Sequence, residues 1–351
     1  MTEQELTQNL GDNFYTEDVR TIQYDETAGT TAKPDVFDWT EGYDVEKDLG
    51  IKLTVKDQAN SSSCGGQAWS TYGEVLEYFD TKTQEERSAK FIYANTVVGN
   101  GGSDGLTNSK FVQTKGWGLE ALTPSIPATE AFLTAKQDIT PIAYQTALKS
   151  RAKVYKQGSG LMDELDINEL ATAIKKNKGA IIGIAGYNNG TWLSYYPTPV
   201  IKQPWNNYWR HWVYAGKAEM INNKKGIWIL NSWGVGCGKN GWQWISEDYF
   251  KAKSSTGISL VWSSWFLEYL PENIENWKHI FSKTLKRGSR NDEVKALQHA
   301  LFLQGMFSDK EDGIFGKITE ASVKAFQKRY SLVADGIVGR NTNNKLNSIF
   351  S

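Results

Sequence analysis

Residues 61–70 read SSSCGGQAWS and place one cysteine, Cys64, between serines and glycines at the start of an apolar segment. Apolar residues then recur at helical spacing and predict a helix over residues 67–79, with Ala68, Tyr72, Val75, Leu76 and Phe79 on one face. A thiol in the first turn of a helix lies near the positive end of the helix dipole, which favours the thiolate and lowers its pKa. Cys64 is therefore a candidate nucleophile, although a cysteine in a Gly/Ser loop is inert as often as it is catalytic.

The composition predicts a globular protein of one or two domains. Of 351 residues, 40% are hydrophobic and 14 are tryptophan, which is enough for a sizeable core. No run of 18 apolar residues exists, and residues 1–20 lack the basic start and apolar centre of a signal peptide, so we expect synthesis in the cytoplasm without membrane insertion. Two cysteines suit a reducing compartment. The absence of a dense Lys/Arg run argues against nucleic-acid binding.

A catalytic thiol ordinarily needs a histidine as base, and the chain has three histidines. His279 falls in a connecting segment and His299 in a C-terminal helix, so we interpret both as surface or packing residues. His211 opens the apolar run HWVYAG, and Asn231 follows 20 residues later at the end of GIWIL. If these runs are adjacent strands, a ring nitrogen of His211 can reach the side-chain oxygen of Asn231.

Residues 167–186, which precede His211, contain the pattern of a helix followed by a strand. INELATAIKKN predicts a helix over residues 167–177, and AIIGIAG, residues 180–186, has the aliphatic density of a buried strand.

The order Cys64, His211, Asn231, with VKDQ at 55–58 and NSWG at 231–234 followed by GKNGW, resembles that of the papain-like cysteine peptidases. The resemblance implies an α+β fold of two lobes, one helical and one an antiparallel β-sheet. It implies that Cys64 is the nucleophile, His211 the general base, and Asn231 the residue that orients His211. By the same resemblance Gln58 donates to the oxyanion, Trp233 shields the histidine, and Gly101 and Gly102 of GNGG contact extended substrate. No metal or cofactor is implied.

The chain also departs from this family at two aromatic positions. Gly65 stands where a tryptophan usually follows the nucleophile, which suggests open space beside the thiol. Cys237 stands where a second tryptophan is usual after NSWG, and a Cys64–Cys237 disulfide is a minor alternative that would block catalysis.

Near the C-terminus, DGIFGKIT at 312–319 recurs as DGIVGRNT at 335–342. In each copy Asp-Gly predicts a turn and the threonine a helix cap, and a further helix is expected from Asn291. The three short helices form a small bundle that resembles the peptidoglycan-binding domain. We interpret Asp312 and Asp335 as turn residues rather than metal ligands.

The predicted organisation is an acidic arm (1–34), a papain-like domain (35–270), a linker (271–284) and a peptidoglycan-binding-like helical domain (285–351). Together the resemblances imply a cysteine endopeptidase that acts on a cell-wall peptide or on a protein at the bacterial wall. A phage lysin, a virion-associated enzyme and a wall-associated bacterial peptidase are all compatible with this organisation. A catalytically silent wall-binding or virion structural protein is the alternative; three dispersed histidines argue against a zinc amidase.

Overall fold

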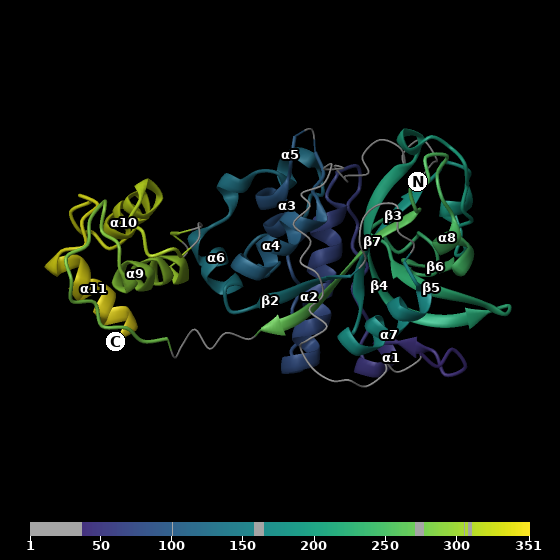
Figure 1. The fold of residues 1–351 in the computed structure, drawn as a ribbon, viewed down its shortest axis with the longest axis horizontal. Coiled ribbons are helices and arrows are strands. Elements are labelled where there is room, and N and C mark those ends of the chain that lie inside the picture. Colours follow the sequence, from purple (N-terminus) through teal and green to yellow (C-terminus); the bar gives the residue numbers. More distant parts are fainter. Residues whose placement is uncertain (1–36, 100, 158–164, 271–276, 305, 308–310) are drawn as a thin grey trace. The chain divides into compact units, whose positions relative to one another are not determined.

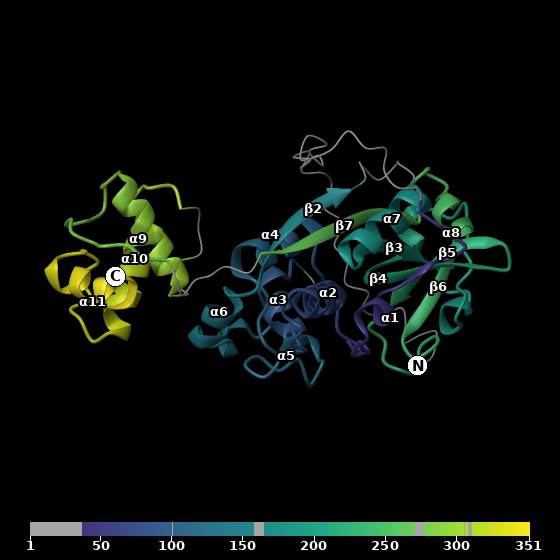
Figure 2. The ribbon, with the colours of Figure 1, turned by 90° about the horizontal axis from the view of Figure 1, so that it is seen from below.

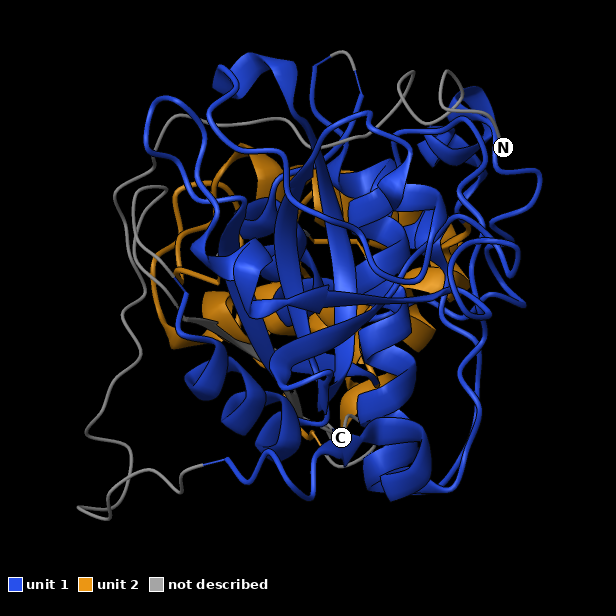
Figure 3. Ribbon diagram, turned by 90° about the vertical axis from the view of Figure 1, so that its right-hand side faces the viewer, with its two compact units in different colours: residues 1–139, 150–270 blue, residues 140–149, 271–351 orange. Residues whose placement is uncertain are grey.

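The computed structural model describes residues 37–99, 101–157, 165–270, 277–304, 306–307 and 311–351, so the predicted acidic arm lies outside the described residues. The chain divides into two compact units (Figure 3). Unit 1 comprises residues up to Ile139 together with Ser150–Leu270, and unit 2 comprises Thr140–Lys149 and the residues from Pro271 to the C-terminus.

Unit 1 is built on an antiparallel sheet of seven strands among the residues described. The strand order is β2-β7-β3-β4-β5-β6, with β1 paired to β4 outside this path. The strands are β1 (Tyr43–Asp44), β2 (Arg151–Gln157), β3 (Ala180–Gly186), β4 (Trp209–Ile221), β5 (Lys224–Leu230), β6 (Trp242–Ser246) and β7 (Val261–Leu270). The predicted strand at 180–186 is confirmed with the same bounds.

The helices of unit 1 cover both faces of this sheet (Figures 1 and 2). They are α1 (Val45–Leu49), α2 (Cys64–Thr81), α3 (Ala89–Thr96), α4 (Gly105–Lys115), α5 (Glu130–Leu133), α7 (Ile167–Asn177) and α8 (Glu247–Lys251), with short 3₁₀ turns at Lys136–Asp138, Thr191–Leu193 and Trp205–Asn207. Helix α2 packs between the sheet and α3 and α4. The predicted helix at 167–177 is confirmed as α7, whereas α2 begins at Cys64, three residues earlier than expected from the apolar pattern.

Alternation along the strands divides the core of unit 1 into two layers, because successive strand residues point to opposite faces. One layer packs with α7 and α8 and contains Ile182, Val213, Ile229 and Ile245. The other packs with α2 and contains Ile181, Trp212, Tyr214, Trp228 and Trp242. Rings of α2 lie against rings of β4, with centroid separations of 5.3 Å for Trp69–Trp212 and 5.4 Å for Tyr72–Tyr214. The N-terminal half of α2 is thereby fixed against β4.

Unit 2 contains the three C-terminal helices that the sequence predicted, together with α6 (Pro141–Ala147). The three are α9 (Asp292–Leu303), α10 (Lys317–Arg329) and α11 (Arg340–Phe350). They share a core that includes Leu148 and Phe281, the first from residues 140–149 and the second from the segment that the sequence suggests is a linker. The compact unit is therefore larger than the linear stretch 285–351.

The threonines of the repeat do not cap the helices, contrary to the sequence prediction. Helices α10 and α11 begin after Gly316 and Gly339, so Thr319 and Thr342 lie inside the first turn. Each threonine hydroxyl accepts a hydrogen bond from a buried glutamine on the preceding helix, Gln298 in one copy and Gln327 in the other. The threonines of the repeat therefore accept a hydrogen bond from a glutamine side chain and do not cap the N-terminus of their helix.

Gln298 and Gln327 play the same part in the two copies of the repeat. The Nε2 of Gln327 donates to Asp335 Oδ1 at 2.9 Å and to the Ile337 carbonyl at 2.9 Å, while its Oε1 accepts from the Gly336 N–H at 2.9 Å. Gln298 binds the corresponding groups of the first loop, including Asp312 Oδ1 at 2.9 Å. Asp312 and Asp335 accept hydrogen bonds from backbone N–H groups within their own turns, as expected of turn residues.

Across the described ranges, no group of His, Cys, Asp and Glu side chains has the arrangement of a metal site. No helix in these ranges has the length and apolarity needed to cross a membrane.

Replacing Gln327 by Met should destabilise unit 2, because it leaves the Gly336 N–H and the Asp335 turn without their buried partner. We expect Gln327→Met to lower the free energy of unfolding by about 2 kcal/mol, measured by hydrogen exchange of α10 and α11 amides in the full chain. Asn344→Ala, at an exposed position of α11, serves as the control. Equal exchange in the two variants would contradict this role of Gln327.

Candidate active site

Two loops distant in the sequence pair with each other at the candidate site. Residues 56–58 run antiparallel to residues 232–234, with a bridge between Asp57 and Trp233 and a hydrogen bond from the Gly234 N–H to the Lys56 carbonyl at 3.1 Å. The Gln58 N–H donates to the Ser232 carbonyl at 2.9 Å, and the Ser232 hydroxyl donates to Gln58 Oε1 at 2.7 Å. Gln58 is therefore held by the segment that carries Asn231.

His211 lies in β4 next to Asn231, which follows the end of β5. The His211 Nε2 and Asn231 Oδ1 are 2.8 Å apart, and because an amide oxygen only accepts, Nε2–H is the donor. The indole of Trp233 is stacked on the imidazole, with ring centroids 5.0 Å apart and an interplanar angle of 22°. His211 and Asn231 are both buried, so their hydrogen bond is shielded from water. The structure thus brings His211, Asn231, Trp233 and Gln58 together.

With Nε2 protonated, the other ring nitrogen of neutral His211 carries the lone pair. Within the described part of the chain, this buried Nδ1 has no hydrogen-bond partner. Burial disfavours the charged imidazolium and lowers the pKa of His211 to about 4, while the bond to Asn231 opposes this shift. Nδ1 is therefore available to take a proton.

Cys64 is the first residue of α2 and is buried. Its neighbour Gly65 contacts the side chain of Ser103, and the Ser103 carbonyl accepts a hydrogen bond at 3.2 Å from the indole of Trp212, the residue after His211. This connection and the packing of α2 on β4 place the start of α2 at the part of β4 that bears His211.

No open space exists beside Gly65, contrary to the suggestion from the sequence. A Cβ at this position would lie 2.3 Å from Ser103 Oγ and 2.5 Å from Asn108 Nδ2. The two side chains bind each other, with Asn108 Nδ2 donating to Ser103 Oγ at 2.8 Å. A polar pair therefore fills the space next to the backbone of Gly65, and only glycine fits there.

The second cysteine, Cys237, is a buried thiol in the apolar layer that contains Trp192 and Trp233. Both cysteines are reduced, so the alternative Cys64–Cys237 disulfide is absent. Burial raises the pKa of Cys237 to about 12, which keeps this thiol protonated at neutral pH. Cys237 is a packing residue.

Gly101 and Gly102 lie in a turn with positive φ angles of 116° and 81°. The Gly102 N–H donates to the Tyr93 hydroxyl at 2.7 Å, and its carbonyl accepts from the Val98 N–H at 3.0 Å. The Tyr93 hydroxyl in turn donates to Glu130, which also accepts the Ser62 N–H at 2.7 Å. The turn is thereby tied to the loop before Cys64.

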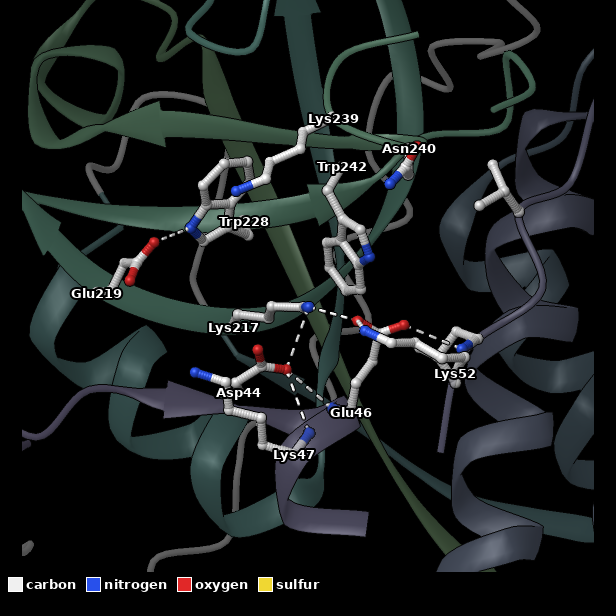
Figure 4. Close-up of a pocket in the computed structure, with 12 residues that line it drawn as sticks. Asp44, Glu46, Lys47, Lys52, Lys217, Glu219, Trp228, Lys239, Asn240 and Trp242 are labelled. Carbon is white, nitrogen blue, oxygen red and sulfur yellow. Dashed lines mark hydrogen bonds and ion pairs between the residues drawn. The ribbon is translucent and has the colours of Figure 1, made fainter. Parts of the chain in front are cut away.

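A separate pocket of about 440 Å³ contains none of the candidate residues (Figure 4). Its charged side chains bind one another: Lys217 Nζ lies 3.1 Å from Asp44 and 2.6 Å from Glu46, and it also lies over the ring of Trp242. Trp242 and the next residue, Gln243, point to opposite faces of β6. The pocket is therefore on the other face of this strand from the His211–Asn231 pair.

Two further polar residues of the site, Ser232 and Gln243, were not predicted from the sequence. Ser232 joins Gln58 to Asn231, and Gln243 accepts a hydrogen bond from Asn231 Nδ2 at 2.8 Å. The one available signal for Gln243 is its position within WQWIS, where a polar side chain interrupts an apolar strand.

Acidification should destabilise unit 1 through His211. The pKa of His211 is about 4 in the folded chain against about 6.5 when unfolded, so between these values the unfolded state binds more protons. The stabilisation from a neutral His211 is complete above pH 6.5 and is lost as the pH falls toward 4. Urea titrations of the wild type should show about 3 kcal/mol more loss between pH 7 and pH 4 than those of His211→Asn. An equal loss of unfolding free energy in the wild type and in His211→Asn would contradict the burial of a neutral His211.

Introducing a methyl group at Gly65 should also be costly. Gly65→Ala should reduce the free energy of unfolding by about 1 to 3 kcal/mol, because Ser103 and Asn108 must move. Adding Ser103→Gly should recover part of the loss. Urea unfolding followed by tryptophan fluorescence measures both; undiminished stability in the single variant would contradict the packing described here.

The main region of the chain is similar in fold to several cysteine proteases of known structure. Xylellain, a cysteine protease from Xylella fastidiosa, superposes with a TM-score of 0.57 at 20% identity, covering 74% of this chain and 96% of that chain. Procathepsin B S9 from Trypanosoma congolense gives 0.54 at 12% identity (77% and 89% covered), and procathepsin L 3 of Tenebrio molitor gives 0.52 at 16% (76% and 79%).

Two comparisons at the level of sequence match parts of the chain. Residues 290–346 match a family model described as a peptidoglycan binding domain. The spore cortex-lytic enzyme of Bacillus cereus is 32% identical over 90 residues, which are 26% of this chain and 32% of the length of that enzyme. The chain therefore combines a papain-like cysteine protease fold, α+β with an antiparallel sheet, with a C-terminal peptidoglycan-binding domain.

Proposed function

We propose that the protein is a cysteine endopeptidase that uses Cys64, His211 and Asn231. The observation that carries this proposal is the buried hydrogen bond of 2.8 Å from His211 Nε2 to Asn231, stacked under Trp233, which leaves Nδ1 of the imidazole as a base. Such an arrangement costs free energy because a buried ring nitrogen has no partner. A function that requires a proton acceptor at this point accounts for it.

In the first half of the proposed reaction, His211 Nδ1 takes the proton of the Cys64 thiol. The sulfur then attacks the carbonyl carbon of a peptide bond, and the position of Cys64 at the start of α2 favours the thiolate. Gln58 Nε2 has two N–H bonds, of which one donates to the Ser61 carbonyl at 2.8 Å, and the other can donate to the oxyanion together with the Cys64 N–H. The C–N bond breaks as His211 gives its proton to the leaving amine.

In the second half, water hydrolyses the resulting thioester. His211 Nδ1 takes a proton from the water, and the hydroxide attacks the acyl carbon. The C–S bond then breaks and the proton on His211 returns to the sulfur of Cys64. Asn231 keeps the ring in one orientation through both halves of the cycle.

The C-terminal domain supports a site of action at the bacterial cell wall. The match of residues 290–346 to the peptidoglycan-binding model and the partial identity with a spore cortex-lytic enzyme both favour this place. Peptides of the wall and proteins attached to it are then the candidate substrates. The curated relative is bacterial, and no comparison supports a phage source.

A thiol-directed peptidase inactivator should test the catalytic pair. We expect an epoxysuccinyl peptide to label Cys64, and not Cys237, in the wild type, with labelling slowed at least about 100-fold in His211→Ala. Mass spectrometry of the digested protein identifies the labelled cysteine, and Cys237→Ala is the control that should behave as the wild type. Labelling that is absent, or equal in His211→Ala, would favour a catalytically silent scaffold.

Binding to the wall is tested separately with the full chain. Purified murein sacculi should retain the wild type on sedimentation, and Cys64→Ala should bind equally, because it leaves unit 2 unchanged. The double variant Gln298→Met and Gln327→Met should lose binding as the repeat loops are released. A wild type that remains in the supernatant would contradict the wall-binding part of the proposal.

A further inference from the structure

Gln243 is a fully buried side chain in β6, where it lies between the buried tryptophans Trp242 and Trp244. The burial of a primary amide is unfavourable unless its hydrogen bonds are made. Here they are made: Oε1 accepts from Asn231 Nδ2 at 2.8 Å, and Nε2 donates to the Trp192 carbonyl at 2.7 Å and to the Ser194 carbonyl at 3.0 Å. Both N–H bonds and the oxygen are thus used.

The partners of Gln243 determine which group donates and which accepts in each hydrogen bond from Gln243 through Asn231 to His211. Carbonyl oxygens only accept, so the carbonyls of Trp192 and Ser194 require Gln243 to turn its NH₂ group toward them. Its oxygen then faces Asn231, which must present Nδ2. Asn231 Oδ1 is left for His211, and the Ser232 N–H, which donates to the same oxygen at 2.8 Å, supports this orientation from the other side.

We propose that Gln243 is a positioning residue that, held by the carbonyls of Trp192 and Ser194, keeps Asn231 oriented so that His211 stays in the Nε2–H form with Nδ1 as the base. The inference rests on the proposed peptidase function for its effect on catalysis. It also assigns a role to the aromatic segment 187–209: its backbone carbonyls at 192 and 194 set the protonation of a histidine that they do not touch.

The composition of the surrounding layer supports a positioning role. Ile227, Ile229 and Ile245, on the same strands, belong to the apolar layer on the face of the sheet toward which Gln243 points. An aliphatic residue would pack there without any need for partners. A glutamine is instead bonded at all three positions, and its oxygen binds Asn231, the partner of His211.

The tautomer of His211 can be observed directly, since the chain has only three histidines. Nitrogen NMR of the full chain labelled with ¹⁵N-histidine, with His211→Asn to assign the signals, should show His211 as the Nε2–H tautomer at pH 7, with a slowly exchanging proton. In Gln243→Met the exchange of this proton should be faster and the Nδ1–H form should become populated. An Nδ1–H tautomer in the wild type, or a Gln243→Met spectrum identical to that of the wild type, would overturn the proposal.

Kinetics supply a second, independent readout on a peptide substrate. Gln243→Met should lower kcat by about 10-fold with little change in KM. Ile245→Val, a neighbour on the same strand without a polar partner, is the control for general loosening. In the Asn231→Ala background, Gln243→Met should have no further effect, and additive losses would overturn the proposal. If the wild type cleaves no peptide while the NMR results are as expected, the proposed function fails and the positioning of His211 stands.

Discussion

Gln58 and Ser232 are separated by 174 residues and bind each other through two hydrogen bonds, one from backbone to backbone and one between side chains. The rest of the candidate site depends on this pairing. Gln58 precedes the helix that begins with Cys64, and Ser232 adjoins the asparagine that binds His211. The proposed oxyanion donor, Gln58, and the proposed orienting residue, Asn231, are therefore parts of one hydrogen-bonded unit.

The site is a polar chain inside an apolar layer. From His211 through Asn231 to Gln243, each polar group is buried, and its neighbours are aromatic or aliphatic. Hydrogen bonds in such surroundings are stronger than in water and more costly to break. His211 Nδ1, in contrast, is a buried ring nitrogen without a hydrogen-bond partner among the described residues. Its lone pair is where the proposed chemistry takes place.

The helices and strands that the sequence predicted most closely are those with a strong local pattern of apolar residues. Helix 167–177 and strand 180–186 are predicted to the residue because the first is strongly amphipathic and the second continuously apolar. Spacing and family resemblance then identified His211 and Asn231 as a pair. The start of α2 was missed because Gly65 and Gly66 have low helix propensity, and tertiary contacts with Ser103 and Ala89 override it.

The features that could not be predicted all depend on contacts between distant residues. The space beside Gly65 is filled by the side chains of Ser103 and Asn108. The repeat threonines do not cap their helices because their hydroxyls bind a glutamine of the preceding helix. The inclusion of residues 140–149 in the C-terminal unit is visible only in three dimensions. Local propensity contains no information about such partners, so only the structure could supply them.

The proposed roles of Cys64, His211 and Gln58 can be examined together in a crystal structure of the full chain treated with a peptidyl chloromethyl ketone. We expect a thioether at Cys64 Sγ, the ketone oxygen within about 3 Å of Gln58 Nε2, and His211 Nδ1 facing the sulfur. An adduct at another residue, or a ketone oxygen that points away from Gln58, would contradict these roles.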